Sequence, residues 1–202
     1  MAAILSDLRN TVISGVVLLV VVAIVVAVWH GGAGLGFDHA WFAFLFRWLH
    51  VVSGVMWIGL LWYFNFVQIP NMPKIPDEQK PAIGKVIAPA ALFWFRWAAL
   101  STLITGLLLA WINGYIVDAV IIGIASADPK HTMIGIGMWL GAIMAFNVWG
   151  VIWPNQQRAL GLVEADADAK AKSARTAMLF SRTNTLLSIP MLWCMVSAQN
   201  LF

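Results

Sequence analysis

Charged residues are scarce in this 202-residue sequence, at 10%, and cysteine occurs only once. A soluble domain of this size carries about a quarter charged residues, so the composition excludes a soluble globular enzyme. The single Cys194 excludes a disulfide framework and a thiolate zinc site, and there is no CxxCH motif for c-type haem. Disorder is excluded because 61% of the residues are hydrophobic. The excess of 12 Lys and Arg over 9 Asp and Glu is too small to indicate a nucleic-acid partner.

The apolar residues come instead in long unbroken runs, which is typical of helical membrane proteins rather than β-barrels. Crossing about 30 Å of hydrocarbon takes roughly 20 such residues. We therefore predict an all-α integral membrane protein in contact with the lipid bilayer, with a single domain of about five transmembrane helices. Helices 2–5 are expected to form a bundle. The predicted spans cover about residues 11–29, 41–68, 86–113, 131–153 and 177–199.

The segments between the spans differ in character. Residues 114–130 contain a shorter apolar stretch interrupted by Asp118, which favours an interfacial or re-entrant piece over a further crossing. Residues 69–81 are rich in proline, and we expect them not to continue the preceding helix. Residues 164–176 are polar and are predicted to form a helical extension outside the bilayer.

Basic residues are distributed unequally over the predicted loops. Lys130 alone lies on one side of the membrane, and the other side holds Arg9, Lys74, Lys80, Lys85, Arg158, Lys170, Lys172 and Arg175. Because cytoplasmic loops carry the excess of Lys and Arg, the N-terminus is predicted to be cytoplasmic and the C-terminus exterior.

Three arginines lie inside predicted spans, whereas all nine acidic residues fall in termini or loops. Arg182 is close enough to the end of its span to reach the surface. Arg96 is about ten residues into its span, so an anionic ligand such as a propionate or a lipid phosphate is one explanation for it. The alternative is that backbone carbonyls, amide side chains or water in a protein-lined cavity satisfy its guanidinium.

His50 lies inside the second predicted span, and helical spacing puts Arg47, Gly54 and Trp57 on its face. Neutral imidazole is a common axial ligand of haem iron. Gly54 would let a flat macrocycle approach the backbone, Trp57 would offer an apolar plane, and Arg47 would pair with a propionate. The alternative is a buried histidine that hydrogen-bonds to a neighbouring helix.

A second metal ligand is less clear from the sequence. His131 opens the fourth predicted span on the same side as His50. A helical rise of 1.5 Å per residue nevertheless puts the two histidines roughly 13 Å apart in depth. His131 therefore stays a candidate ligand, and the coordination number stays open.

Three segments resemble a known family: HVVSGVMWIGLLWYFNFVQIP at residues 50–70, NVWGVIWPNQQRALG at 147–161 and SRTNTLLSIPMLW at 181–193. They are similar to the membrane domain of bacterial urate hydroxylase, the urate oxidase N-terminal family, over about residues 41–199. In that family the domain usually precedes a c-type cytochrome.

The resemblance implies a redox protein of the bacterial inner membrane that binds haem b iron and passes electrons to a cytochrome c. It favours His50 as the haem ligand and makes Arg47, Trp57, Arg96 and Arg182 candidates for the haem pocket. Since the sequence has no CxxCH motif, we expect a separate cytochrome c to accept the electrons. The alternative is a non-catalytic accessory subunit of a larger respiratory or photosynthetic membrane complex.

Overall fold

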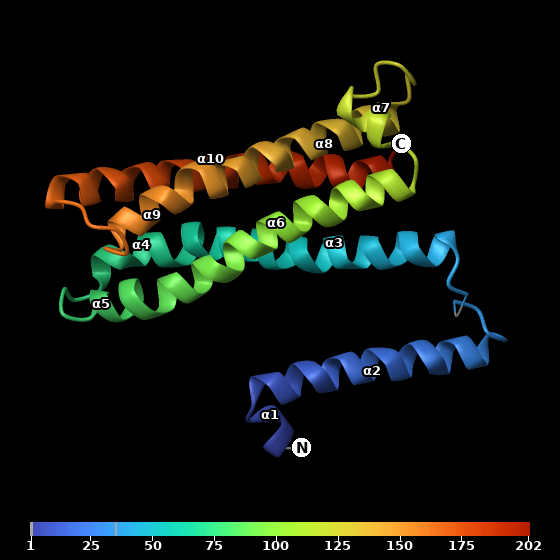
Figure 1. Ribbon diagram of the computed structural model, residues 1–202, viewed down its shortest axis with the longest axis horizontal. Coiled ribbons are helices and arrows are strands. Elements are labelled where there is room, and N and C mark those ends of the chain that lie inside the picture. The colour runs from blue at the N-terminus through green and yellow to red at the C-terminus, as the bar shows by residue number, and fades with distance from the viewer. Residues whose placement is uncertain (1, 35) are drawn as a thin grey trace. The chain divides into compact units, whose positions relative to one another are not determined.

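The computed structural model describes residues 2–34 and 36–202, and within these ranges the chain forms helices and no strand (Figure 1). The elements, including π-helical and 3-10 segments labelled η, are α1 (Ala2–Leu5), α2 (Leu8–Trp29), α3 (His39–Trp62), η1 (Tyr63–Gln68), α4 (Ile69–Asn71), η2 (Met72–Lys74), α5 (Lys80–Ala82), η3 (Ile83–Ile87), α6 (Ala88–Ile112), α7 (Ile116–Val120), α8 (Pro129–Phe146), η4 (Asn147–Ile152), α9 (Trp153–Ala159) and α10 (Ala167–Asn200).

Four helical stretches are long and apolar enough to cross a membrane, which confirms the predicted class. They are Leu8–Trp29, His39–Lys74, Lys80–Ile112 and Pro129–Ala159. The second stretch has 36 residues, which at 1.5 Å per residue is about 54 Å and exceeds a hydrocarbon core of about 30 Å. Such helices extend beyond the spans predicted from the sequence.

The fifth predicted span, residues 177–199, lies within α10, a 34-residue helix that is too polar to qualify by composition. Some of its polar side chains face the protein: Asn184 and Ser188 are both 0% exposed. Asn184 accepts a hydrogen bond from the Asn147 amide at 2.9 Å and donates to the Met144 carbonyl at 2.9 Å. Because α10 packs along α8, η4 and α9 (Figure 1), it runs beside a candidate span.

We expected residues 69–81 not to continue the preceding helix. This expectation is wrong for residues 69–74, because helical structure continues to Lys74. Each of three π-helical segments ends two residues before a proline, at Pro70, Pro89 and Pro154. Proline lacks an N–H, and its ring collides with the carbonyl four residues earlier. In all three segments the residue before the proline donates instead to the carbonyl five residues earlier, so the wider turn accommodates the ring.

The remaining local expectations concern two loops. Residues 116–120 form α7, a helix of 5 residues that is far too short to cross the bilayer. The polar segment 164–176 is helical from Ala167, where α10 begins behind an N-cap by Asp166. The Asp166 carboxylate accepts from the Ala169 N–H at 2.7 Å, which satisfies one of the free donors of the first turn.

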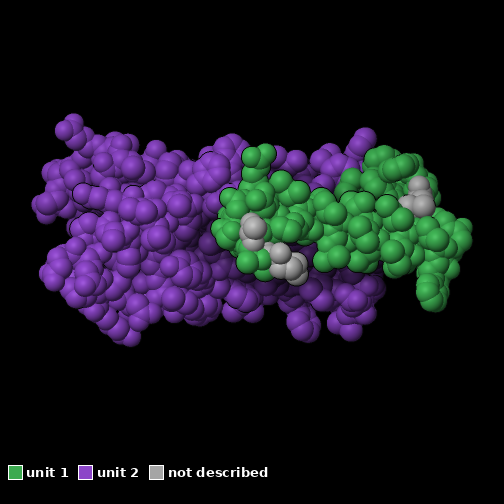
Figure 2. Space-filling model, turned by 90° about the horizontal axis from the view of Figure 1, so that it is seen from below, with its two compact units in different colours: residues 1–45 green, residues 46–202 purple. Residues whose placement is uncertain are grey.

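Contacts divide the chain into two compact units, residues 1–45 and 46–202, coloured separately in Figure 2. In the first unit, α2 begins behind Asp7, whose carboxylate accepts from the Asn10 N–H at 2.8 Å. Ala27 is the one buried residue described in α2. The Val, Leu and Ile side chains of this helix are exposed, as expected of a helix that contacts lipid. The prediction of a single domain stays a prediction.

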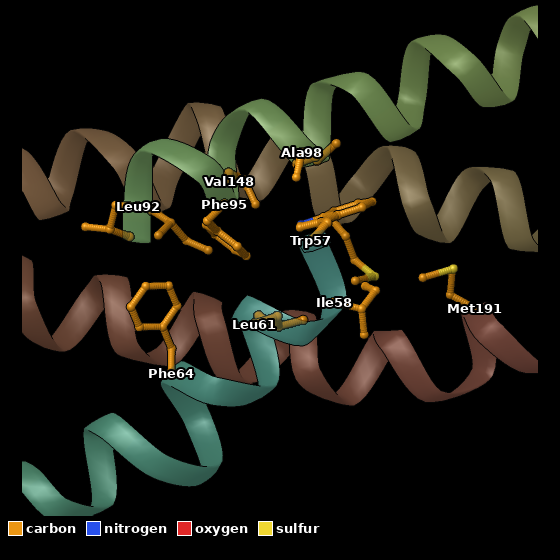
Figure 3. Packing of buried hydrophobic residues seen from close by; sticks show 13 residues of the cluster. Trp57, Ile58, Leu61, Phe64, Leu92, Phe95, Ala98, Val148 and Met191 are labelled. Carbon is orange, nitrogen blue, oxygen red and sulfur yellow. The ribbon is translucent and has the colours of Figure 1, made fainter. Parts of the chain in front are cut away.

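The second unit has a hydrophobic core to which α3, α6, α8 with η4, and α10 all contribute (Figure 3). Trp57, Leu61 and Phe95 are among its fully buried large side chains. Helices α8 and α10 approach closely at Gly137, where a Cβ atom would lie only 3.2 Å from the Cβ of Cys194. A side chain at this position would therefore force the helices apart.

Candidate functional site

His50 projects from α3 towards α6, and its imidazole is half-buried. Its Nδ1 lies 2.9 Å from the backbone carbonyl oxygen of Thr102, and the Thr105 hydroxyl is 3.5 Å from the same nitrogen. A carbonyl oxygen can only accept, so the nitrogen facing it carries the hydrogen. The hydrogen bond predicted by the alternative interpretation of His50 is thus present, and it uses only one of the two ring nitrogens.

The imidazole lies directly against Gly106 of α6. A Cβ atom at Gly106 would be 2.8 Å from Cε1 and 3.0 Å from Nδ1 of His50, which is closer than side-chain atoms pack. The absence of a side chain at Gly106 therefore creates the notch that receives the ring. The sequence contains this glycine, but no spacing within α6 shows that it faces a histidine 56 positions earlier.

The consequence for His50 is a fixed tautomer. With the hydrogen on Nδ1, the lone pair of the ring is on Nε2, and the described residues offer Nε2 no hydrogen-bond partner. Histidines that bind metals commonly have this arrangement, in which a carbonyl accepts from one nitrogen and the other nitrogen binds the metal.

Gly54 and Trp57, predicted to share the His50 face, both lie where α3 packs on the rest of the bundle. A Cβ at Gly54 would make an ordinary contact of 3.9 Å with the Thr102 methyl group. Trp57 is 2% exposed and belongs to the hydrophobic core (Figure 3). Its indole Nε1 is buried and has no hydrogen-bond partner among the described residues, so a buried donor is left free on this face.

Arg96 is buried in α6, at 9% exposure, and stacks on an aromatic side chain. Its Cζ lies 3.3 Å from the ring centroid of Trp153 and 5.9 Å from that of Trp149. Trp149 also donates from Nε1 to the Arg96 carbonyl at 3.2 Å. Such cation–π contacts stabilise a guanidinium that water does not reach. This partner was not predicted from the sequence, although Trp149 and Trp153 are four residues apart and so share a helix face.

The stacking leaves part of Arg96 unsatisfied. Its Nε and Nη1 are buried without a hydrogen-bond partner among the described residues, and no carboxylate of those residues forms an ion pair with it. Three amide oxygens are similarly buried without a partner, on Asn65, Gln68 and Gln156. The interior of the bundle thus contains both free donors and free acceptors.

The other predicted site residues lie elsewhere in the second unit. Arg182 is exposed on α10. Arg47 is exposed on α3 and lines a cleft of about 280 Å³ together with His131. The structure therefore brings Arg47 and His131 together, although the sequence analysis assigned them separate roles.

His131 lies in the first turn of α8. Its Nδ1 is 3.0 Å from the Ser126 hydroxyl and 3.7 Å from a carboxylate oxygen of Asp118, and its ring stacks on Tyr115 at 6.1 Å between centroids. These partners differ from the α6 residues that contact His50. Within residues 2–34 and 36–202, no group of three or more His, Cys, Asp and Glu side chains is arranged to hold a metal ion.

Comparisons with known proteins agree with the resemblance seen in the sequence. The family model described as urate oxidase N-terminal matches residues 110–201, from the end of α6 through α10. No curated protein and no solved structure shows a significant match. The matched part includes two of the three segments that carry the resemblance, residues 147–161 and 181–193. Residues 110–201 are therefore similar to the urate oxidase N-terminal family.

Proposed function

We propose that this chain is a membrane redox protein in which His50 binds the iron of a b-type haem and electrons pass to a separate cytochrome c. The observation that carries the proposal is the geometry of His50: its Nδ1 faces the Thr102 carbonyl at 2.9 Å, which leaves Nε2 as the free ligand atom. Similarity to the urate hydroxylase membrane domain over residues 110–201 supports a redox role.

The residues around His50 fit such a group. Trp57 Nε1 is a buried donor without a partner, and Gly54 puts no side chain between it and His50 on the same helix face. Arg47, one turn from His50, is exposed and has no ion-pair partner among the described residues, so it can pair with a propionate. Arg96 is further from this face and is held by its tryptophan contacts.

The chemistry would be divided between the group and the chain. Bound haem iron supplies the one-electron exchange. His50 provides the ligand nitrogen, and the Thr102 carbonyl orients the ring and increases the basicity of Nε2. The apolar core that contains Trp57 would keep water from that side of the group. We place the chain in the bacterial inner membrane with a cytoplasmic N-terminus, which the distribution of basic residues between the loops supports.

The test is the haem content of the purified protein and of two histidine variants, measured as the pyridine haemochrome. His50→Ala removes the proposed ligand and is expected to abolish haem binding. His131→Ala is the matched control, because His131 contacts Ser126 and Asp118 rather than α6, and we expect it to retain haem. Retention of haem by His50→Ala would refute the role of His50.

A second candidate function is that of an accessory subunit in a larger respiratory or photosynthetic membrane complex. The observation that favours it is α2, of which Ala27 alone is described as buried, so this helix offers apolar surface to a partner subunit or to lipid. An accessory subunit would co-purify with larger subunits in mild detergent. Isolation of a haem-containing chain without partners would exclude it.

A further inference from the structure

One end of the second unit contains a cleft that shares Arg47 with the proposed haem pocket but does not include His50. It has a volume of about 280 Å³ and is lined by side chains from three helices and the turn after α6: Arg47 of α3, Asn113 and Tyr115 after α6, Lys130 and His131 of α8, and Gln199 of α10. Pockets for drug-sized ligands start at about 300 Å³. The cleft is therefore the right size for a small solute or a headgroup.

The charge of the cleft is positive. Arg47 and Lys130, 83 positions apart in the sequence, both line it, and no aspartate or glutamate does. Two described carboxylates contact residues of the cleft: Asp128 accepts from the Lys130 backbone N–H at 2.9 Å, and an oxygen of Asp118 lies 3.7 Å from His131 Nδ1. Neither forms an ion pair with the side chain of Arg47 or Lys130, so these two charges remain without an ion pair among the described residues.

The walls of the cleft add shape and hydrogen-bonding groups. The rings of Tyr115 and His131 are stacked, with an interplanar angle of 23°. The Asn113 amide donates to the Leu109 carbonyl at 2.8 Å, and Gln199 brings a second amide. Burial raises the pKa of Tyr115, and the positive charge of Arg47, which lines the same cleft, acts against this rise.

The position of the cleft makes it accessible from the membrane surface. One candidate span ends at Ile112 and another begins at Pro129, so the residues of the cleft lie where spans meet the headgroup region. Guanidinium and ammonium groups at that level bind oxygen anions through charge-assisted hydrogen bonds, and partial exclusion of water strengthens the attraction.

We propose that this cleft is a binding site for a phosphate group, carried by a lipid headgroup or by a small solute. Arg47 and Lys130 bind the phosphate oxygens from two helices, and the amides and the stacked rings enclose the rest of the ligand. His50 does not line the cleft, and Arg47 is the lining residue that the proposed haem pocket also uses.

The experiment is calorimetric titration of the delipidated protein in a neutral detergent with two probes, inorganic phosphate and the short-chain lipid dioctanoyl phosphatidylglycerol. Each of Arg47→Gln and Lys130→Gln is expected to weaken binding at least about tenfold, since each removes a charge-assisted hydrogen bond. Arg47→Lys keeps the charge and should retain most of the affinity. The matched controls Arg175→Gln and Lys85→Gln change exposed residues at the other end of the unit and should leave binding unchanged.

The two probes distinguish the source of the phosphate. Binding of the lipid alone, lost in both cleft variants, identifies a headgroup site, and binding of both probes identifies a site open to solutes. Equal affinity in all variants, or no binding of either probe, overturns the proposal. Binding that occurs only in haem-free His50→Ala protein also overturns it, because a haem propionate would then occupy the cleft.

Discussion

Substituting alanine for Gly106 perturbs His50 without changing either the histidine or its hydrogen-bond acceptor. The new Cβ would lie 2.8 Å from the His50 Cε1, whereas carbon atoms pack at about 3.5–4.0 Å. The ring must therefore withdraw by about 0.7–1.2 Å. A shift of that size lengthens the 2.9 Å contact between Nδ1 and the Thr102 carbonyl to a distance at which a hydrogen bond is lost.

The expected cost follows from these contacts. Losing the hydrogen bond costs about 0.5–1.5 kcal/mol, and overpacking a filled site costs about 1–3 kcal/mol. Alanine recovers about 1 kcal/mol through its higher helix propensity. We therefore expect Gly106→Ala to lower the free energy of unfolding by about 2 kcal/mol.

The assay is unfolding in mixed micelles by increasing SDS, followed by circular dichroism. Gly141→Ala is the matched control, because no atom lies within 4 Å of the Cβ it would add, and it should be neutral or stabilise by up to about 1 kcal/mol. If Gly106→Ala is as stable as Gly141→Ala, the notch at Gly106 does not hold the His50 ring.

Three further substitutions test contacts in the interior. Trp153→Leu removes the ring 3.3 Å from the Arg96 guanidinium. A double-mutant cycle with Arg96→Met in the same unfolding assay should give a coupling energy of about 1–2 kcal/mol. Additive effects of the two substitutions on the free energy of unfolding would contradict the contact. Asn184→Leu leaves the buried Asn147 amide unpaired and should lower the free energy of unfolding by about 1–3 kcal/mol. Adding Asn147→Leu should restore part of this stability, and a double variant no more stable than Asn184→Leu would count against the hydrogen bond between the two asparagines. Gly135→Ala would drive a Cβ into a carbonyl oxygen of α7. Amide hydrogen exchange in α7 should therefore accelerate while α10 stays protected. Unchanged exchange in α7 would refute the close packing of α7 on α8.

The helices were predictable from the sequence, whereas their ends were not. In lipid, a run of about 20 apolar residues has few ways to form hydrogen bonds with all its backbone N–H and C=O groups, and the helix is one of them. The prolines at 70, 89 and 154 predict breaks when each is considered alone. The π-helical turns before them let the helices continue, and this depends on backbone geometry that residue type does not specify. The composition of α10 is likewise too polar to qualify as a candidate membrane span, because it includes polar residues, such as Asn184 and Ser188, that are buried within the protein.

The candidate site was predictable only within one helix. Helical spacing puts Arg47, Gly54 and Trp57 on the His50 face, but the groups that fix the imidazole come from α6. A contact between residues more than 50 positions apart, such as that of His50 with Thr102, depends on how helices pair. The same reason explains why the stacking on Arg96 and the shared cleft of Arg47 and His131 were missed.

Whether His50 holds a haem can be read from the absorption spectrum of the purified chain, oxidised and then reduced with dithionite. A haem on His50 gives a Soret band and a sharpened α band on reduction, and we expect both to be absent from His50→Ala and retained in His131→Ala. A colourless wild-type protein, purified from cells supplied with haem and folded by circular dichroism, would contradict it.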